Sequence, residues 1–458
     1  MSKNLDQIIV ENSSFRDPAG FVFKRKGKVY RQINPAGRED YDLLMASRLY
    51  DSLIDKGFMV PHQEILENVP PEAYRIIQPQ QIDFISYPYE WSFSMLKDAA
   101  LLTLKIQRMS LEHGMSLKDA SAYNVQFSDA RPVFIDTLSF TQNDSSPWPA
   151  YRQFCQHFLI PLLLMAKRDI GLQALLKVHM DGIPLSLAAK LLPFWTKFSP
   201  RIFLHVHLHA RIQAKHSSSN STRIPQMTVK RKLMVIDSLI SFVRSINWKP
   251  KKTEWGDYYS FTNYDDNSLK HKTEIVEAFL KTVMPVTCWD IGANNGYFTR
   301  IASRLGVKSV AFDIDPVAVE NNYLQIKQLK EVNLLPLLCD VCNPSPAIGW
   351  HGKERKSLFE RGRADLVMGL ALIHHLAISN NLPLAKIAEF FSAVADNVIM
   401  EFVPKTDSKV QVLLASRKDI FPNYDQGNFE REFSKYFAIR DKQRVKNSER
   451  TLYLFSRL

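Results

Sequence analysis

The chain has 458 residues, enough for two or three domains of ordinary size. Hydrophobic residues make up 45% of it and charged residues 23%, as in globular proteins, and the longest apolar run, 158–166, is far shorter than the roughly 20 residues that cross a membrane. The amino terminus lacks the apolar run of a signal peptide, and four cysteines are too few for a disulfide framework. We therefore expect a cytoplasmic protein.

The first 214 residues are predicted to form an α+β domain. A hairpin is expected over 20–33, turning at Gly27, because two runs of alternating apolar residues flank this glycine. The elements expected after it are a helix over 39–56, strands at 74–77 and 82–87, and a long helix over 93–113.

A polar constellation follows the long helix. Asp119 is followed five residues later by Asn124, and Asp136 comes twelve residues after that, on an apolar run. This spacing resembles the catalytic loop and metal-binding aspartate of protein-kinase-like folds. The resemblance implies that Asp119 orients an acceptor hydroxyl and that Asn124 and Asp136 hold Mg²⁺ beside ATP.

The constellation departs from the kinase pattern in several ways. There is no glycine-rich phosphate loop, Lys118 stands where arginine is usual, and the strand that should carry a lysine offers Arg31. We therefore predict a kinase-like fold with degenerate chemistry. The alternative is an unrelated α+β domain in which Asp119 and Asn124 cap a turn.

A polar, serine-rich stretch, 215–228, is predicted to link this domain to a C-terminal domain over 229–458. Basic residues gather around it: the segment 201–252 contains eleven lysines and arginines against one acidic residue, Asp237, and so holds most of the net charge of +12. Such a segment either contacts a polyanion (nucleic acid, anionic lipid or anionic glycan) or is a solvated linker.

The C-terminal domain begins with a helix over 233–246 and a second helix over 268–282. From residue 286 onward, short β-rich runs alternate with helical ones, a pattern typical of a parallel sheet with helices on both faces. Strands are expected at 286–291, 309–314, 334–339, 364–370 and 397–402, helices at 297–305, 317–329, 383–395 and 408–418, and a closing hairpin at 436–441 and 451–456.

The turn after the first of these strands carries two glycines within an Asp-x-Gly-x-x-x-Gly pattern. It reads Asp290-Ile-Gly292-Ala293-Asn294-Asn-Gly296. This turn resembles motif I of class I S-adenosylmethionine (SAM)-dependent methyltransferases, which have a Rossmann-like sheet. The resemblance implies that Asp290 meets the methionine amino group and that the glycines let SAM lie against the backbone. Dinucleotide binding is the competing use of such a turn, but its Gly-x-Gly-x-x-Gly spacing is absent.

Acidic residues follow the next two strands. Asp313 comes 23 residues after Asp290, where an acid can accept hydrogen bonds from both ribose hydroxyls, and Asp315 is its close alternative. After the third strand, Asp340 matches the acid that the family places near the adenine amino group. Cys339 and Cys342 form a lone C-x-x-C pair, so no zinc site is expected.

Two histidines, His374 and His375, follow the fourth strand, whose end faces the transferred methyl group in this family. A histidine there is a candidate general base. The alternative is that one of them caps a helix or packs against the cofactor. The Asn-Pro-Pro-Tyr motif typical of base-nitrogen methylation is absent, which favours a hydroxyl or another small-molecule acceptor.

Together, the two halves resemble bacterial methyltransferase-like proteins of the nodulation host-specificity type. The resemblance extends over the segments 119–140, 148–158 and 401–411. The resemblance implies a role in modifying a saccharide. We therefore predict an enzyme that methylates a hydroxyl of a saccharide or small molecule. The alternatives are an RNA methyltransferase that uses the basic segment as a phosphate contact, and a non-catalytic SAM-binding scaffold with a pseudokinase module.

Overall fold

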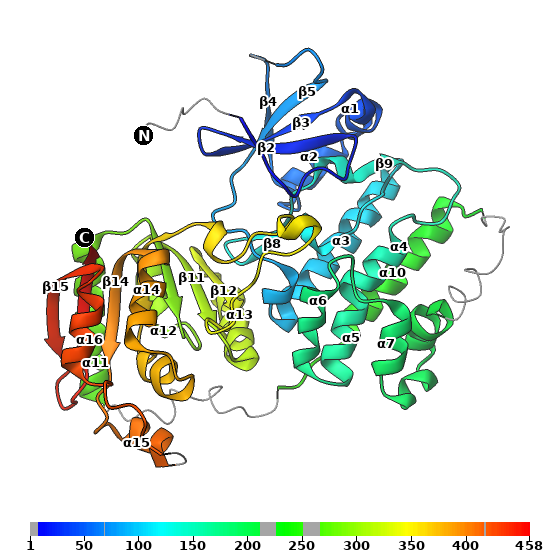
Figure 1. Cartoon of the computed structure of the whole chain (residues 1–458). Coiled ribbons are helices and arrows are strands. Elements are labelled where there is room, and N and C mark those ends of the chain that lie inside the picture. Colours follow the sequence, from blue (N-terminus) through cyan, green and yellow to red (C-terminus); the bar gives the residue numbers. More distant parts are fainter. Residues whose placement is uncertain (1–7, 68, 211–225, 251–265, 416–417) are drawn as a thin grey trace. The chain divides into compact units, whose positions relative to one another are not determined.

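The computed structural model describes residues 8–67, 69–210, 226–250, 266–415 and 418–458 (Figure 1). The chain divides into two compact units. The first comprises Met1–Lys249 together with Ala347–Arg355, and the second comprises Pro250–Pro346 and Lys356–Leu458. Within the described ranges, no helix combines the length and apolarity that crossing a membrane requires.

The first unit begins with an antiparallel sheet in the order β1-β2-β3-β5-β4. Its strands are β1 (Ile9–Val10), β2 (Gly20–Arg25), β3 (Lys28–Ile33), β4 (His62–Ile65) and β5 (Arg75–Pro79). The predicted hairpin is confirmed: β2 and β3 pair and turn at Lys26 and Gly27, both with positive φ. The strand expected at 82–87 is wrong, since β5 ends at Pro79 and the sheet is completed by β4.

The predicted helix over 39–56 is interrupted in the structure. It forms α1 (Arg38–Ala46) and α2 (Leu49–Asp55), because Arg48 between them adopts a left-handed backbone with φ of +59°. The long helix is confirmed as α3 (Phe93–Glu112), which begins where the Ser92 hydroxyl accepts a hydrogen bond from the Met95 amide. Nearly every apolar side chain of α3 is buried, so this helix forms the core of the unit.

Two short strand pairs follow α3. In the first pair, β6 (Met115–Leu117) lies antiparallel to β9 (Phe140–Gln142), and in the second β7 (Val125–Ser128) lies antiparallel to β8 (Arg131–Phe134). The α-helices described from there to residue 210 are α4 (Tyr151–Phe154), α5 (Ile160–Lys167), α6 (Leu175–Val178), α7 (Leu185–Leu191) and α8 (Pro200–Ile202), with π-helical turns at Cys155–Leu159 and Phe203–Leu208.

The boundary between the units differs from the one expected at 215–228, a stretch mostly outside the described residues. Helix α10 (Val229–Ser245), which the sequence pattern assigns to the C-terminal domain, packs along α3 in the first unit. Its apolar side, with Ile236, Leu239 and Val243, is buried. Lys97 on α3 donates hydrogen bonds to the Arg244 and Ile246 carbonyls at 2.9 and 2.7 Å. An amphipathic helix alone does not reveal which core covers it.

A short segment between β12 and β13 of the second unit also belongs to the first unit. It is Ala347–Arg355. Within the first unit, Glu354 pairs with Arg16 at 2.7 Å, and the Arg355 guanidinium lies 4.3 Å from the Tyr123 ring centre. The C-terminal domain is therefore not the continuous stretch 229–458 that the sequence suggests.

The second unit contains a seven-stranded sheet in the order β12-β11-β10-β13-β14-β16-β15. Its strands are β10 (Thr287–Ile291), β11 (Lys308–Asp313), β12 (Leu334–Leu338), β13 (Ala364–Gly369), β14 (Ala395–Phe402), β15 (Phe437–Arg444) and β16 (Thr451–Arg457). Strands β10 to β14 are parallel, and β16 is antiparallel to both β14 and β15. This is the Rossmann-like class I methyltransferase arrangement that motif I predicts, closed by the expected hairpin.

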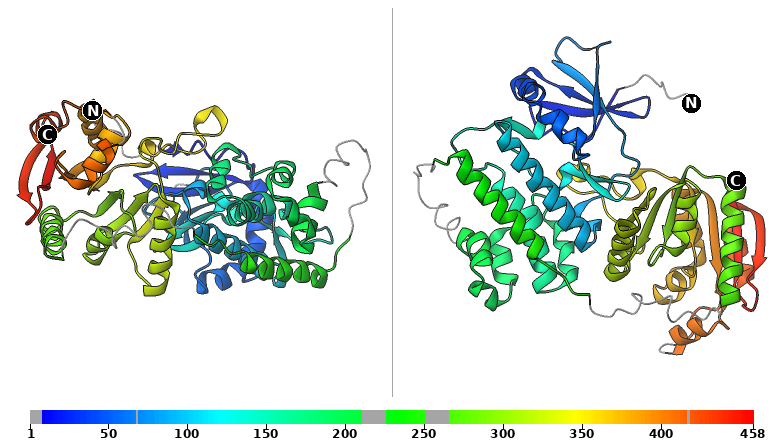
Figure 2. Two further views of the ribbon diagram at one scale, coloured as in Figure 1. Left: turned by 90° about the horizontal axis from the view of Figure 1, so that it is seen from below. Right: turned by 180° about the vertical axis from the view of Figure 1, so that it is seen from behind.

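Helices cover both faces of this sheet (Figure 2). They are α11 (Asp266–Val283), α12 (Tyr297–Arg304), α13 (Pro316–Leu329), α14 (Leu384–Val394), α15 (Ser408–Ala415) and α16 (Gln426–Phe433). On one face, Val276 and Phe279 of α11 pack with Leu366, Met368 and Ile399 of the sheet. On the other face lie α14 and α16; we did not predict α16, which is only eight residues long. The parallel strands are buried almost throughout, because helices cover both of their sides.

Candidate active site

The predicted glycine turn joins β10 to α12 at the carboxyl edge of the sheet, where doubly wound sheets bind ligands. Gly292 and Gly296 have φ of +77° and +79°, a region that favours glycine. The amides of Gly292 and Ala293 both donate to the Phe312 carbonyl, at 2.9 and 3.0 Å. A Cβ on Gly296 would lie 2.6 Å from the Asn322 amide nitrogen. The turn is therefore tightly packed and tolerates no side chain at this position.

Asp290 lies on β10 just before this turn and is buried. Its carboxylate accepts a hydrogen bond of 2.6 Å from the Thr299 hydroxyl on α12. Burial raises the pKa of Asp290 to about 7, since the charged form loses its hydration. A cationic group placed next to this carboxylate would favour its ionised form.

Asp313 and Asp315, the two candidates for the ribose site, have different surroundings. Asp313 ends β11, and its carboxylate accepts hydrogen bonds from the Asn294 amide at 2.7 Å and the Asp315 amide at 2.8 Å. Burial raises the pKa of Asp313 to about 6. The Asp315 carboxylate instead caps α13 by accepting from the Val317 amide at 2.7 Å. Only Asp313 contacts the glycine turn, and this favours it as the ribose ligand.

Asp340 follows β12, and its carboxylate accepts from the Cys342 amide at 2.9 Å. Strands β12, β11 and β10 are neighbours, and Asp313 pairs in register with Leu338. Asp290, Asp313 and Asp340 therefore lie along one edge of the sheet, as the sequence predicts. Their roles toward a ligand stay predictions.

His374 and His375 follow β13 and begin a π-helical turn, in which the His375 amide donates to the Leu372 carbonyl at 2.9 Å. Their ring centres are 4.1 Å apart. Burial lowers the pKa of both imidazoles, that of His375 to about 4. At neutral pH both rings are therefore uncharged, and burial makes each a weaker base than an exposed imidazole.

Sequence reasoning missed a buried group of charges behind this turn. Glu401 on β14 and Lys272 on α11 form an ion pair of 2.6 Å, with 0% and 3% of their side chains exposed. Arg450 lies 3.8 Å from Glu401 and pairs with Asp407 at 2.7 Å. The available signal was an acid within the apolar run 398–402, but nothing local points to its partners.

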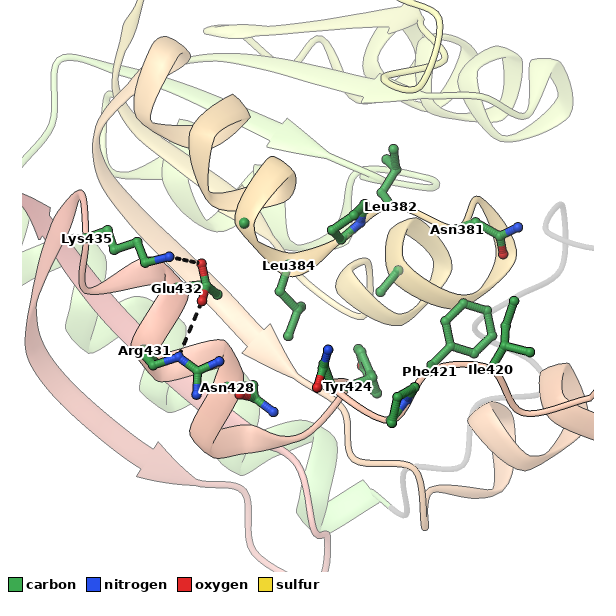
Figure 3. A pocket seen from close by; sticks show the side chains of 15 residues that line it. Asn381, Leu382, Leu384, Ile420, Phe421, Tyr424, Asn428, Arg431, Glu432 and Lys435 are labelled. Atoms are coloured by element: carbon green, nitrogen blue, oxygen red, sulfur yellow. Dashed lines mark hydrogen bonds and ion pairs between the residues drawn. The ribbon is translucent and has the colours of Figure 1, made fainter.

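A cavity of about 570 Å³ opens beside α14 and α16 (Figure 3). Part of its wall follows β13 and includes Asn381, Leu382 and Leu384, and another part follows β14 and includes Phe421 and Tyr424. Both wall segments come after parallel strands in the chain, but no residue of the glycine turn and neither His374 nor His375 lines the cavity. The cavity combines aromatic and aliphatic surface with amide groups.

The kinase-like constellation is assembled in the first unit. Asn124 donates to the Ser139 hydroxyl at 3.0 Å, and Ser139 in turn donates to Asp136. Arg31 on β3 forms an ion pair with the same Asp136 carboxylate. Burial raises the pKa of Asp119, and the nearby Asp136 adds to this effect. Among the described residues, no three His, Cys, Asp or Glu side chains are grouped as metal ligands.

Lys118 and part of the basic segment 201–252 have specific partners inside the first unit. Lys118 pairs with Asp40 of α1 at 2.8 Å. In the basic segment, Lys232 is 3% exposed and donates to the Asn143 side chain and the Asp144 carbonyl, both at 2.7 Å. Part of the positive charge is therefore used inside the first unit. Residues 211–225 and 251–252 of this segment lie outside the described part of the chain.

No family model matches the chain. Nodulation protein NoeA of Rhizobium meliloti (strain 1021) is 35% identical over 458 residues, which cover 97% of this chain and 95% of NoeA. Solved structures include the N-methyltransferase NodS from Bradyrhizobium japonicum WM9 with S-adenosyl-L-homocysteine (SAH), which is 11% identical with a TM-score of 0.33 and covers 44% of this chain and 94% of NodS. The bifunctional kinase-methyltransferase WbdD is 16% identical with a TM-score of 0.29 and covers 42% of this chain and 40% of WbdD.

The assignment rests on the NoeA match and, for the fold, on the strand order and glycine turn of the second unit. The chain belongs to the NoeA family of nodulation proteins, and its second unit has the Rossmann-like fold of class I SAM-dependent methyltransferases.

Proposed function

We propose that this chain transfers a methyl group from SAM to a hydroxyl of a saccharide or a related small molecule. The observation that carries the proposal is the shape and charge of the carboxyl edge of the second sheet. A tight turn that begins and ends with glycine, Gly292 to Gly296, lies between two buried acids, Asp290 and Asp313.

The residues fit SAM. Asp290, whose pKa is raised by burial, gains its charge when an ammonium group such as that of methionine lies next to it. The Asp313 carboxylate accepts from backbone amides, and its remaining lone pairs suit ribose hydroxyls. When bound, SAM supplies an electrophilic methyl group that needs no further activation.

The protein then has to orient the acceptor and remove its proton. His375 follows β13, and its neutral imidazole accepts the proton of an acceptor hydroxyl. A pKa of about 4 makes it a weak base in the absence of ligand. Orientation of the hydroxyl in line with the methyl group therefore carries a large part of the rate enhancement.

The cavity in Figure 3 supports a saccharide-sized acceptor. Phe421 offers an aromatic face, and Asn381, Asn423 and Asn428 offer amides that both donate and accept, as vicinal hydroxyls require. At one end of the cavity, Glu432 pairs with Lys435 at 2.5 Å and with Arg431 at 3.4 Å, so the opposite charges of these side chains partly cancel. A mainly uncharged, hydroxyl-rich ring matches this lining better than a polyanion.

The test is incubation of the full chain with methyl-labelled SAM and fractionated cell extract, followed by identification of the labelled product. We expect label in a saccharide fraction with the wild type, and at least about tenfold less with Phe421→Ala, an effect of a lost hydrophobic contact. Phe194→Ala removes an aromatic side chain that is 70% exposed in the first unit and serves as the matched control. Label only in RNA or protein would contradict the acceptor class.

The RNA alternative has weaker support, because Lys232 of the basic segment is committed to internal hydrogen bonds. Steeply salt-dependent RNA binding by the full chain would revive it, since phosphate contacts release counterions. We expect no retention of a single-stranded RNA probe at physiological salt.

The first unit is proposed to be a kinase-like module without phosphotransfer. Arg31 and Ser139 both contact the Asp136 carboxylate, so a Mg²⁺ ion would have to displace an arginine there. The residues present therefore do not fit a Mg²⁺–nucleotide. We expect ATP with Mg²⁺ to leave the thermal unfolding midpoint (Tm) of the full chain unchanged, and a clear rise would overturn this reading.

A further inference from the structure

Resting on the proposed function, we infer that Glu401 is a positioning residue that holds the turn after β13 against the SAM-binding glycine turn. Its Oε2 atom accepts hydrogen bonds from the Ala371 amide and from the Lys272 ammonium, both at 2.6 Å. The three residues come from different elements: β14, the turn after β13, and α11. One carboxylate thereby joins them at the carboxyl edge of the sheet.

The turn that Glu401 holds has an unusual backbone. Ala371 has φ of +50°, a left-handed conformation that residues other than glycine rarely adopt. Such conformations persist where surrounding contacts fix them, and they cluster at functional sites. The short hydrogen bond from Ala371 to Glu401 is a contact of this kind.

Leu372, the residue after Ala371, connects this turn to the glycine turn and to His375. The Leu372 side chain lies so close to Gly292 that a Cβ there would be 3.2 Å from its Cδ1 atom. The Leu372 carbonyl accepts the His375 amide at 2.9 Å, which begins the turn with the candidate base. A shift at Ala371 would therefore move both the packing on Gly292 and the position of His375.

Lys272, the ion-pair partner of Glu401, also contacts the helix that follows the glycine turn. Its ammonium lies 4.8 Å from the ring centre of Phe298, on the helix that follows the glycine turn. Its charge also lowers the pKa of Asp290 against the effect of burial. Buried ion pairs seldom add net stability relative to apolar residues of similar size. A geometric role explains this costly pair better than a stabilising one.

The test compares two double variants that both remove the buried ion pair. In Lys272→Met/Glu401→Gln, the glutamine oxygen still accepts from the Ala371 amide, whereas in Lys272→Met/Glu401→Leu this hydrogen bond is lost. The probe is SAH, titrated calorimetrically into the full chain. We expect the Gln variant to bind SAH within about threefold of the Lys272→Met variant, and the Leu variant about tenfold more weakly, as for one lost hydrogen bond to a strained turn.

A merely structural role predicts a different pattern, in which SAH affinity follows Tm in both variants. Adding Ala371→Gly to the Leu variant gives a further readout, because glycine adopts positive φ without strain. We expect this change to restore most of the SAH affinity without restoring the ion pair. Equal affinities of the Gln and Leu variants, or no rescue by Ala371→Gly, would overturn the inference.

Hydrogen exchange of the wild type covers the case in which the double variants fail to fold. The Ala371 amide should exchange slowly in the free chain and more slowly still with SAH, and rapid exchange in both states would contradict the inference. If wild-type protein binds no SAH at all, the proposed function itself fails. If the wild type binds SAH normally and the variants bind it with unchanged affinity, only the proposed role of Glu401 is contradicted.

Discussion

Both units place aspartates next to short strands, but they surround these acids differently. In the first unit, Asp136 pairs with the Arg31 guanidinium and the Ser139 hydroxyl. In the second unit, Asp290 and Asp313 are buried and receive hydrogen bonds from a hydroxyl and from backbone amides, so burial raises the pKa of each. A buried acid with uncharged donors is stabilised by an incoming cation or hydroxyl, whereas an ion-paired acid already has its partner. Asp119 of the first unit is also partly buried with a raised pKa, so the contrast separates Asp136, and not every acid of that unit, from Asp290 and Asp313. On this contrast we place the proposed SAM site in the second unit.

The largest expected effect concerns the acceptor side. His375→Ala should lower the rate of methyl transfer by about 10²-fold, the lower end of the usual contribution of a general base, because a pKa of about 4 makes this imidazole a weak base. SAH affinity should change little, since the imidazole acts on the acceptor. Single-turnover transfer from labelled SAM measures the rate and calorimetry the affinity. An unchanged rate would assign His375 to packing.

The two acids make SAM binding dependent on pH. Asp290 and Asp313, with pKa values of about 7 and 6, lose their charge as the pH falls through this range. Affinity for SAM should therefore drop by about tenfold or more between pH 8 and pH 5.5, because protonated carboxyls no longer attract the ammonium group. Titration calorimetry at four or five pH values measures this. A SAM affinity of the wild type that does not change with pH would contradict the proposed difference between the acids of the two units.

The same acids make the stability of the ligand-free chain pH-dependent. A folded-state pKa above the unfolded value means that the native state binds more protons between about pH 4 and pH 7, so stability rises as the pH falls through this window. Asp290→Asn removes one of these protons. As the pH falls from 8 to 5, the Tm of the wild type should therefore rise by a few degrees relative to the Tm of Asp290→Asn. This size follows because 1 kcal/mol corresponds to about 2–4 °C. A difference in Tm that stays constant with pH would show that Asp290 is already charged.

The smallest effect is expected in the first unit. Arg31→Met leaves Asp136 without its cation and should lower the free energy of unfolding by about 1–3 kcal/mol, the cost of a lost charged hydrogen bond in a partly buried site. Arg31→Met/Asp136→Asn should recover part of this loss. SAH affinity should be unaffected in both variants. Denaturant unfolding with parallel SAH titration checks both statements, and a large loss of SAH affinity would contradict separate roles for the units.

Much of the second unit was predictable because its signals are local. The strands near 286, 309, 334, 364 and 397 lie within about two residues of the expected positions, since apolar β-rich runs alternate there with helices. The glycine turn and Asp313 could be placed for the same reason. The helix pattern over 39–56 did not reveal the break at Arg48, which depends on a single positive φ.

What the sequence did not reveal depends on contacts between distant residues. Helix α10 is amphipathic, but only the structure shows that α3 covers its apolar side. Lys272 and Glu401 are 129 positions apart, and no spacing rule connects them. The segment 347–355 has no composition that would assign it to the first unit. In each case, the partner and not the residue itself determines the role.

The central claim, that the carboxyl edge of the second sheet binds SAM, is tested most directly by calorimetric titration of SAH into Asp313→Ala. As the matched control, Glu389→Ala removes an exposed acid from α14. The account predicts that Asp313→Ala loses at least about 100-fold in affinity, as for two charge-assisted hydrogen bonds, while Glu389→Ala binds like the wild type. Wild-type affinity in Asp313→Ala, with Tm unchanged, would contradict it.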